Sequence, residues 1–332
     1  MPVAYELVIG PRDTMKPCRI DKSLRCLSLL LSFIVAALFG CSALQRTQMP
    51  PRPEIVPVDY ELDGVPFYPQ AAYQCGPSAL AMALTYRGLS ITPKALKSQV
   101  YTSSRKGSLQ MAMVGATRRH GKIAYEITGP DAIFPEIAAG HPVIVLQNLG
   151  FSRLPVWHYA IVIGYNFIEK SVILRSGVTQ RKVMSYDAFE KSWAHSNYWG
   201  LMVLDPTQIP VLAEENKYLA AILGLEKSRQ FQAAVTGYQT ALTRWPISLT
   251  ALMGMGNSYY ALGDLPGAEG AFREATERHP LAAPAYNNLA HVLLEQGRKP
   301  EALAAAQKAA SLGGPLSPIS KKTLQEIRSK MP

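Results

Sequence analysis

The sequence contains few charged residues, cysteines and histidines for a chain of 332 residues. Charged residues make up 17% and hydrophobic residues 48%, which is typical of globular and not of disordered proteins. The four cysteines and six histidines match no metal-ligand spacing. The glycine-rich stretch GMGNSY at 254–259 lies inside a predicted helix, which argues against a phosphate-binding loop. We therefore predict neither a metal nor a cofactor.

The net charge of +10 is not concentrated in any long basic run. A protein that binds nucleic acid usually gathers its basic residues in a stripe or patch. Scattered cations are instead typical of a solvated surface, and they also suit a position beside anionic lipid. The sequence thus predicts no nucleic-acid partner.

The N-terminal region has the pattern of an export signal. Basic residues in segment 16–26 precede the apolar segment 27–41. Its run of about fourteen apolar residues is shorter than the roughly 20 needed to span a bilayer. LFGC at 38–41 resembles the lipobox of bacterial lipoproteins, in which cleavage precedes a cysteine that then receives lipid. We predict a signal peptide over 1–40 and a lipid on Cys41. The alternatives are an uncleaved anchor helix and a start at Met15.

Export of this kind changes the number of free thiols. Cys18 and Cys26 would leave with the signal peptide, and Cys41 would carry lipid. Cys75 would then be the only free thiol, in a compartment where thiols tend to pair. The location predicted is the cell envelope, at the outer membrane and facing the periplasm. Residues 41–57 are polar and rich in proline, so they are expected to form a tether.

Residues 58–206 mix helical and strand patterns. Segments 78–88 and 108–121 are predicted helices, each with a glycine at its end. Three short apolar runs between turns are predicted strands, and a fourth completes the sheet. The order of helices followed by strands favours an α+β fold with an antiparallel sheet. The predicted strands are 141–148, 158–166, 170–177 and 201–206.

Residues 213–330 are rich in alanine and repetitive. Pro246 and Pro280 are 34 residues apart, and the same spacing superposes small residues and aromatics. This period resembles the tetratricopeptide repeat, an all-α solenoid. We predict about three repeats with a capping helix over 320–330. An unrelated helical bundle is the alternative. The superposed sets are Ala234, Ala268 and Ala302; Tyr238, Phe272 and Ala306; and Ala241, Ala275 and Ala309.

Cys75 lies where a turn meets the start of a predicted helix. Gly76 permits a sharp turn and Pro77 suits a first helical turn, so Cys75 is expected just outside the helix N-terminus. The partial positive charge there would lower the pKa of the thiol from about 8.5 and favour the reactive thiolate. Cys75 is thus a candidate nucleophile, and an inert buried thiol is the alternative.

His158 is the candidate general base. It alone among the histidines opens a strongly apolar strand, where a rigid scaffold could aim its ring. A purely structural role is the alternative. The other histidines belong to turns, a polar segment or the repeats: His120, His141, His195, His279 and His291.

QAAYQCGPSAL at 70–80, HPVIVLQN at 141–148 and WHYAIVIGYN at 157–166 together resemble the C39 peptidases and C39-like proteins of the papain-type superfamily. The resemblance covers roughly residues 63–205. It implies a papain-like α+β domain in which Cys75 is the nucleophile and His158 the general base. It also implies that Gln70 donates to the oxyanion, although Gln70 could instead be a solvated loop amide.

One family feature is missing. An aspartate usually follows the next strand and orients the imidazole, but Arg175 and Ser176 stand there in this sequence. Ser176, Asn166 and Asp187 remain candidates for that role, and nothing in the sequence chooses among them. Well-known family members cut leader peptides after paired glycines inside membrane exporters. This chain has an export signal instead, so that preference is not carried over.

Three functional hypotheses follow from these residues. The first is a membrane-anchored cysteine peptidase of the cell envelope, whose repeats recruit a peptide or protein substrate or partner. The second is a non-catalytic scaffold lipoprotein that binds peptides, since the usual acid is missing. The third is a thiol-dependent amidase or acyltransferase that uses the same three residues. A pKa of Cys75 far below 8.5 would favour an enzyme, and an unreactive thiol would favour the scaffold.

Overall fold

The structure, a computed structural model, describes residues 49–70, 73–315 and 317–330. The predicted signal peptide, Cys41 and the tether up to residue 48 lie outside these ranges. In the described remainder of the predicted tether, Val56 is buried and Met49 packs against the core. Among the described helices, none combines the length and hydropathy that crossing a bilayer requires.

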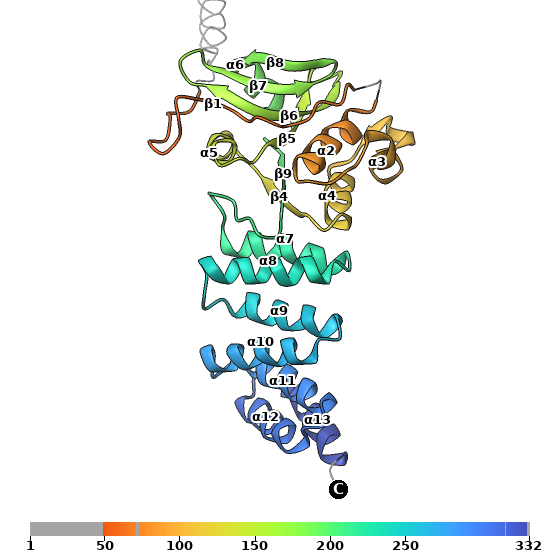
Figure 1. Cartoon of the computed structure of the whole chain (residues 1–332), viewed down its shortest axis with the longest axis vertical. Helices are drawn as coiled ribbons and strands as arrows, with labels where there is room; N and C mark the ends of the chain where they lie inside the picture. The colour runs from red at the N-terminus through yellow and green to blue at the C-terminus, as the bar shows by residue number, and fades with distance from the viewer. Residues whose placement is uncertain (1–48, 71–72, 316, 331–332) are drawn as a thin grey trace, which may run out of the picture. The chain divides into compact units, whose positions relative to one another are not determined.

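Within the described residues, seven strands form an antiparallel sheet in the order β4–β9–β5–β6–β7–β8, and β1 pairs with β6 (Figure 1). A separate small sheet pairs β2 with β3. The strands are β1 (Asp59–Glu61), β2 (Tyr101–Thr102), β3 (Gly107–Ser108), β4 (Ile123–Ile127), β5 (Val143–Asn148), β6 (Trp157–Asn166), β7 (Ser171–Ser176), β8 (Thr179–Ser185) and β9 (Gly200–Leu204).

The predicted strands are present, and the sheet also contains strands that were not predicted. Segments 141–148, 158–166 and 170–177 correspond to β5, β6 and β7. The strand predicted over 201–206 is β9, which lies inside the sheet between β4 and β5. The edge strand β8 is mostly exposed and polar, so its sequence lacks the apolar alternation that signals a strand.

Helices cover this sheet. The helix α2 packs on β5, β6 and β9, and its alanines allow the close approach (Figure 1). The helix predicted over 108–121 is α4, which is shorter at both ends. The helices are α2 (Cys75–Tyr86), α3 (Pro93–Val100), α4 (Gln110–Arg119), α5 (Ile133–Ala138) and α6 (Tyr186–Ala194), with short 3₁₀ turns at η1 (Ser103–Arg105) and η2 (Pro130–Ala132).

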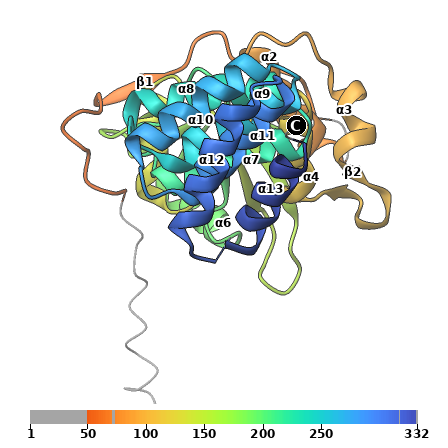
Figure 2. The same cartoon turned by 90° about the horizontal axis from the view of Figure 1, so that it is seen from below.

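The C-terminal region is helical, as predicted. Consecutive helices pack in pairs, and α13 closes the array (Figure 2). The bounds are α7 (Glu215–Lys227), α8 (Phe231–Arg244), α9 (Leu249–Ala261), α10 (Leu265–Arg278), α11 (Ala283–Glu295), α12 (Lys299–Leu312) and α13 (Ser317–Ser329).

The superposed small and aromatic residues of the repeats are all buried, as their period requires. The glycines of GMGNSY serve this packing. A Cβ atom on Gly254 would lie 2.3 Å from the ring of Tyr238, and one on Gly256 would lie 2.5 Å from that of Phe272. Because both glycines are inside α9, the stretch is a helix contact and not a phosphate-binding loop.

The segment that joins β9 to α7 is held by side chains from both sides. Glu136 on α5 is 1% exposed and accepts hydrogen bonds from the backbone N–H groups of Val211 (3.2 Å) and Leu212 (3.0 Å). From α8, Arg244 donates to the carbonyl oxygen of Pro210 at 2.9 Å. Helix α7 also packs directly on β4. The joining segment is therefore a fixed connection with paired backbone groups.

Candidate active site

Cys75 is the first residue of α2, so the helix begins three residues earlier than predicted. The turn before it uses Tyr73, whose φ of 62° is left-handed, and not Gly76. Gly76 is required for a different reason: a Cβ atom there would lie 2.3 Å from Ser108 Oγ. The glycine after the thiol thus lets β3 pack closely against the start of α2.

The sulfur of Cys75 is largely buried, and burial raises the pKa of its thiol. Three backbone N–H groups, those of Tyr159, Gly76 and Cys75 itself, are directed at the sulfur and oppose this effect without overcoming it. The expectation that the helix N-terminus lowers the pKa is therefore wrong for the unliganded site. The thiol is neutral at rest because removal from water outweighs the helix and its N–H groups.

His158 stands near the start of β6, where it pairs with Gln147 of β5. Burial and the nearby positive charge of Lys182 lower the pKa of His158 to about 4. The imidazole is therefore neutral at physiological pH and able to accept a proton. Tyr159, the next residue, directs its N–H at the Cys75 sulfur, so the thiol lies against β6 beside the histidine.

Of the three candidates for orienting the imidazole, Ser176 is the one in contact. Its Oγ lies 3.0 Å from His158 Nε2, at the end of β7. Asn166 ends β6, far along the strand from His158, and its side chain accepts from Glu169 N–H. Asp187 forms an ion pair with Lys191 on α6 at 2.8 Å. A hydroxyl therefore occupies the place beside the ring.

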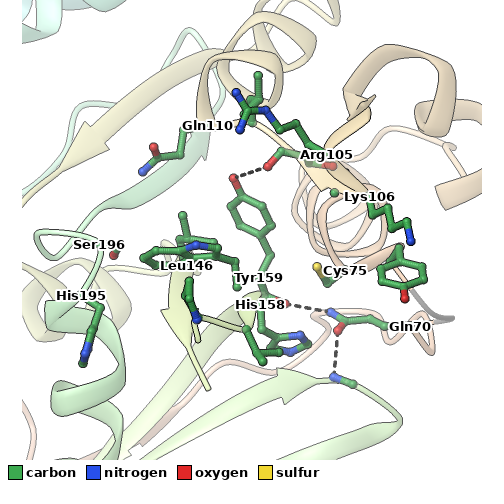
Figure 3. A pocket seen from close by; sticks show the side chains of 18 of the residues that line it. Gln70, Cys75, Arg105, Lys106, Gln110, Leu146, His158, Tyr159, His195 and Ser196 are labelled. Atoms are coloured by element: carbon green, nitrogen blue, oxygen red, sulfur yellow. Dashed lines mark hydrogen bonds between the residues drawn. The ribbon is translucent and has the colours of Figure 1, made fainter. Parts of the chain in front are cut away.

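Gln70 is buried and hydrogen-bonded to backbone at both ends of its side-chain amide. Its Nε2 donates to the carbonyl oxygen of Tyr159 at 3.2 Å, and its Oε1 accepts from Gly177 N–H at 2.9 Å (Figure 3). Gln70 is thus not a solvated loop amide. It ties β6 to the turn that follows Ser176, and one Nε2 hydrogen remains for another acceptor.

Cys75, His158 and Gln70 line one cavity of about 1090 Å³. In Figure 3, Cys75 lies on the same side as Arg105 and Lys106, and His195 and Ser196 lie on the opposite side. The structure therefore brings together the three residues singled out in the sequence. It adds others that carry no motif, because they come from the short β2–β3 hairpin, from the connection between β5 and β6, and from the segment that follows α6.

No group of three or more potential metal ligands exists among the residues that the structure describes. His195, which lines the cavity, is engaged instead with the carbonyl oxygen of Lys191 at 2.8 Å and with Ser152 Oγ at 3.2 Å. The chemistry available at the site is that of a thiol, an imidazole and amide donors.

Comparison with known families agrees with this geometry. The model of the peptidase C39 like family matches residues 62–200, and a tetratricopeptide repeat model matches 219–275 and 253–317. Residues 62–200 are thus similar to the C39-like family. That domain is followed by tetratricopeptide repeats, which belong to a class of protein-binding solenoids. No curated protein matches the chain.

Solved structures resemble the two regions separately. A crystal structure described as a C39-like peptidase from Bacillus anthracis is 18% identical and covers 44% of this chain and 97% of its own, with a TM-score of 0.38. The type III secretion translocator chaperone SycD of Yersinia enterocolitica is 18% identical over 35% of this chain and 83% of its own, with a TM-score of 0.33. The Sgt2 TPR domain of Aspergillus fumigatus is 20% identical over 35% and 78%, also with a TM-score of 0.33.

Proposed function

We propose that this protein is a cysteine peptidase in which Cys75 attacks the peptide carbonyl and His158 moves the proton. The observation that carries the proposal is the shared cavity, in which Tyr159 N–H is directed at the sulfur from the residue next to His158. Because thiol and imidazole are both neutral at rest, the proton transfers as the S–C bond forms, and not beforehand.

We assign each step of this proposal to an atom. With Ser176 Oγ at Nε2, the ring nitrogen available to the thiol is Nδ1. Nδ1 accepts the thiol proton during attack and then delivers it to the leaving amine, which leaves a thioester on Cys75. A water molecule, deprotonated by His158, hydrolyses that thioester. The oxyanion is stabilised by Cys75 N–H and by the Gln70 Nε2 hydrogen not used by Tyr159.

The strand register supplies a place for the substrate backbone. Leu149 N–H donates to Val156 O, so the backbone N–H and C=O groups of Val156 and of alternate residues after it point toward β5. The backbone groups of Trp157 and Tyr159 point away from β5. On that edge β7 pairs with β6 only from Ile161 onward. The backbone N–H and C=O of Trp157 are thus directed to the cavity, where an extended peptide pairs with them.

The test is cleavage of a complex peptide mixture by the full chain, with new termini identified by mass spectrometry. We expect cleavage that iodoacetamide abolishes and a metal chelator leaves unchanged. If the repeats recruit substrate, an intact protein is cleaved at lower concentration than a short peptide spanning the same bond. No new termini from any mixture, with the Cys75 thiol intact, would contradict the proposal.

Two observations favour a second candidate, a non-catalytic peptide-binding scaffold. The pKa of Cys75 is raised, and the imidazole contacts a hydroxyl where a carboxylate would stabilise its charged form better. Such a scaffold would bind peptides in the same cavity without turnover. Tight peptide binding by the wild type, without cleavage of the bound peptide, would support it.

Ser176→Ala tests the hydroxyl beside the ring. We expect kcat/KM to fall about fivefold to tenfold, since one neutral hydrogen bond contributes about 1 kcal/mol. Ser176→Asp should raise the pKa of His158 and move the acidic limb of the pH–rate profile upward. The matched control is Thr179→Ala, an exposed hydroxyl on β8. Equal rates and profiles for all these variants would exclude a positioning role for Ser176.

For location, we propose a lipoprotein of the cell envelope that faces the periplasm, anchored by lipid on Cys41. Support comes from the basic segment 16–26, the apolar segment 27–41 and the LFGC sequence at 38–41. Wild type and Cys26→Ala should incorporate radioactive palmitate in growing cells, whereas Cys41→Ala should not. Equal labelling of the Cys41 variant, or no labelling of the wild type, would contradict lipid anchoring at Cys41.

A further inference from the structure

The cavity carries positive charge on one flank. Arg105 and Lys106 line it, no aspartate or glutamate is among its lining residues, and no carboxylate within the described ranges forms an ion pair with either cation. Both side chains are exposed. They are presented by the turn between β2 and β3, in which Lys106 has a left-handed φ of 47°. These are free cations on a folded turn beside Cys75 (Figure 3).

A second set of lining residues is apolar. Pro155, Val156 and Trp157 line the cavity immediately before His158. Pro155 and Val156 belong to the connection between β5 and β6, which projects as a narrow hairpin (Figure 2), and Trp157 begins β6. Further along it, Phe151 is 80% and Leu154 74% exposed, which is unusual for large apolar side chains on an ordered hairpin.

Hydrogen bonds hold this apolar hairpin in shape. Asn148 Oδ1 accepts from the N–H groups of Gly150 (3.0 Å) and Val156 (2.9 Å). The backbones of Phe151 and Leu154 bond to each other in both directions, and Ser152 contacts His195 of the α6 end. An apolar surface fixed in advance loses little entropy when a ligand covers it, which is what a binding element requires.

We propose that the site selects peptides that place a carboxylate against Arg105 and Lys106 and a bulky apolar side chain against the β5–β6 hairpin. This inference rests on the proposed function and adds its substrate class. Charge complementarity favours an anionic group because two unpaired cations face a cavity without acidic residues. Both sets of residues line the same cavity as Cys75 and His158, so one bound chain contacts both.

A lipid surface is the other occupant to consider, because apolar and basic side chains together also suit anionic membranes. The observations favour a peptide. Pro155, Val156, Trp157, Arg105 and Lys106 line the same concave site as Cys75, so they face into the cavity that a substrate enters. A peptide can contact the two cations and the apolar residues while its backbone pairs with β6.

The test uses fluorescent peptide pools that are identical except for one acidic, neutral or basic position and one leucine or glycine position. Binding to the full-length Cys75→Ala protein is measured by anisotropy, so the result does not depend on catalysis. We expect acidic, leucine-containing pools to bind at least about tenfold tighter than basic ones, and the difference to shrink between about 0.05 and 0.5 M salt.

Arg105→Glu/Lys106→Glu should reverse the charge preference and leave the leucine preference in place. The matched control is Lys321→Glu/Lys322→Glu, an adjacent pair of exposed cations on α13. Equal binding of acidic and basic pools by the parent protein overturns the proposal. So does loss of binding to anionic vesicles in the Arg105/Lys106 variant while peptide selectivity is unchanged. If Cys75→Ala binds these peptides selectively but the wild type cleaves none of them, the proposed peptidase is contradicted and the proposed selectivity is still supported.

Discussion

Cys75→Ala is expected to lower peptide cleavage by at least about four orders of magnitude, because the variant has no atom that can form the thioester. Cys75→Ser should be nearly as inactive, since a hydroxyl is a much weaker nucleophile than a thiol. Both changes are small at a half-buried position, so the fold should be kept. The measurement is the initial rate on a peptide that the wild type cleaves.

Thermal unfolding of both variants provides the control. Midpoints within a few degrees of wild type would show that lost activity reflects lost chemistry. Residual cleavage within about tenfold of wild type by Cys75→Ala would mean that another group performs the reaction. In that case the sulfur is a packing element, and the proposed thiol mechanism is wrong.

His158→Ala should reduce kcat/KM at neutral pH by about 10³-fold, the usual size of a general acid–base contribution. The pH profile is the sharper test. Since the pKa of His158 is about 4, the ring stays neutral down to that pH, and activity should be lost only as pH falls through about 4. A histidine of ordinary pKa would already lose base function below about 6.5.

Lys182→Gln tests the cause of the low pKa of His158 separately. Burial is the main cause of the low pKa and the charge of Lys182 the second, so removing that charge should move the acidic limb to higher pH. Neutralising Lys191, which is paired with Asp187, should leave the limb in place. A wild-type limb near 6.5 that neither variant moves would contradict the neutral, buried imidazole.

Much of the site could be predicted from the sequence because its main residues belong to strong local patterns. The apolar run after His158 specifies β6, and Pro77 in the first helical turn indicates the start of α2. The family resemblance then supplied Gln70. The sequence did not reveal that Gln70 is bound at both amide ends, since its partners Tyr159 and Gly177 lie on distant segments.

The thiol pKa could not be predicted because it depends on competing effects. A helix N-terminus is visible in the sequence and lowers a thiol pKa, but burial of Cys75 against the rest of the domain depends on the whole fold. Burial wins, so the sign of the prediction was wrong. Likewise, Ser176 could be placed beside His158 only once β7 was paired with β6.

The cations Arg105 and Lys106 escaped notice for another reason. They follow no motif, and exposed basic residues are common along a chain with a net charge of +10. Only the position of the β2–β3 turn at the cavity distinguishes them from the rest. Specificity residues on short turns are therefore hard to find from sequence, whereas nucleophile and base are easier.

The central claim, that Cys75 and His158 act as nucleophile and base in one site, is tested most directly by acyl-enzyme formation from p-nitrophenyl acetate. We predict a burst of one nitrophenolate per chain, an acetyl group mapped to Cys75, and a burst rate that falls sharply in His158→Ala. The absence of a burst, with Cys75 still reactive toward a disulfide reagent, would contradict it.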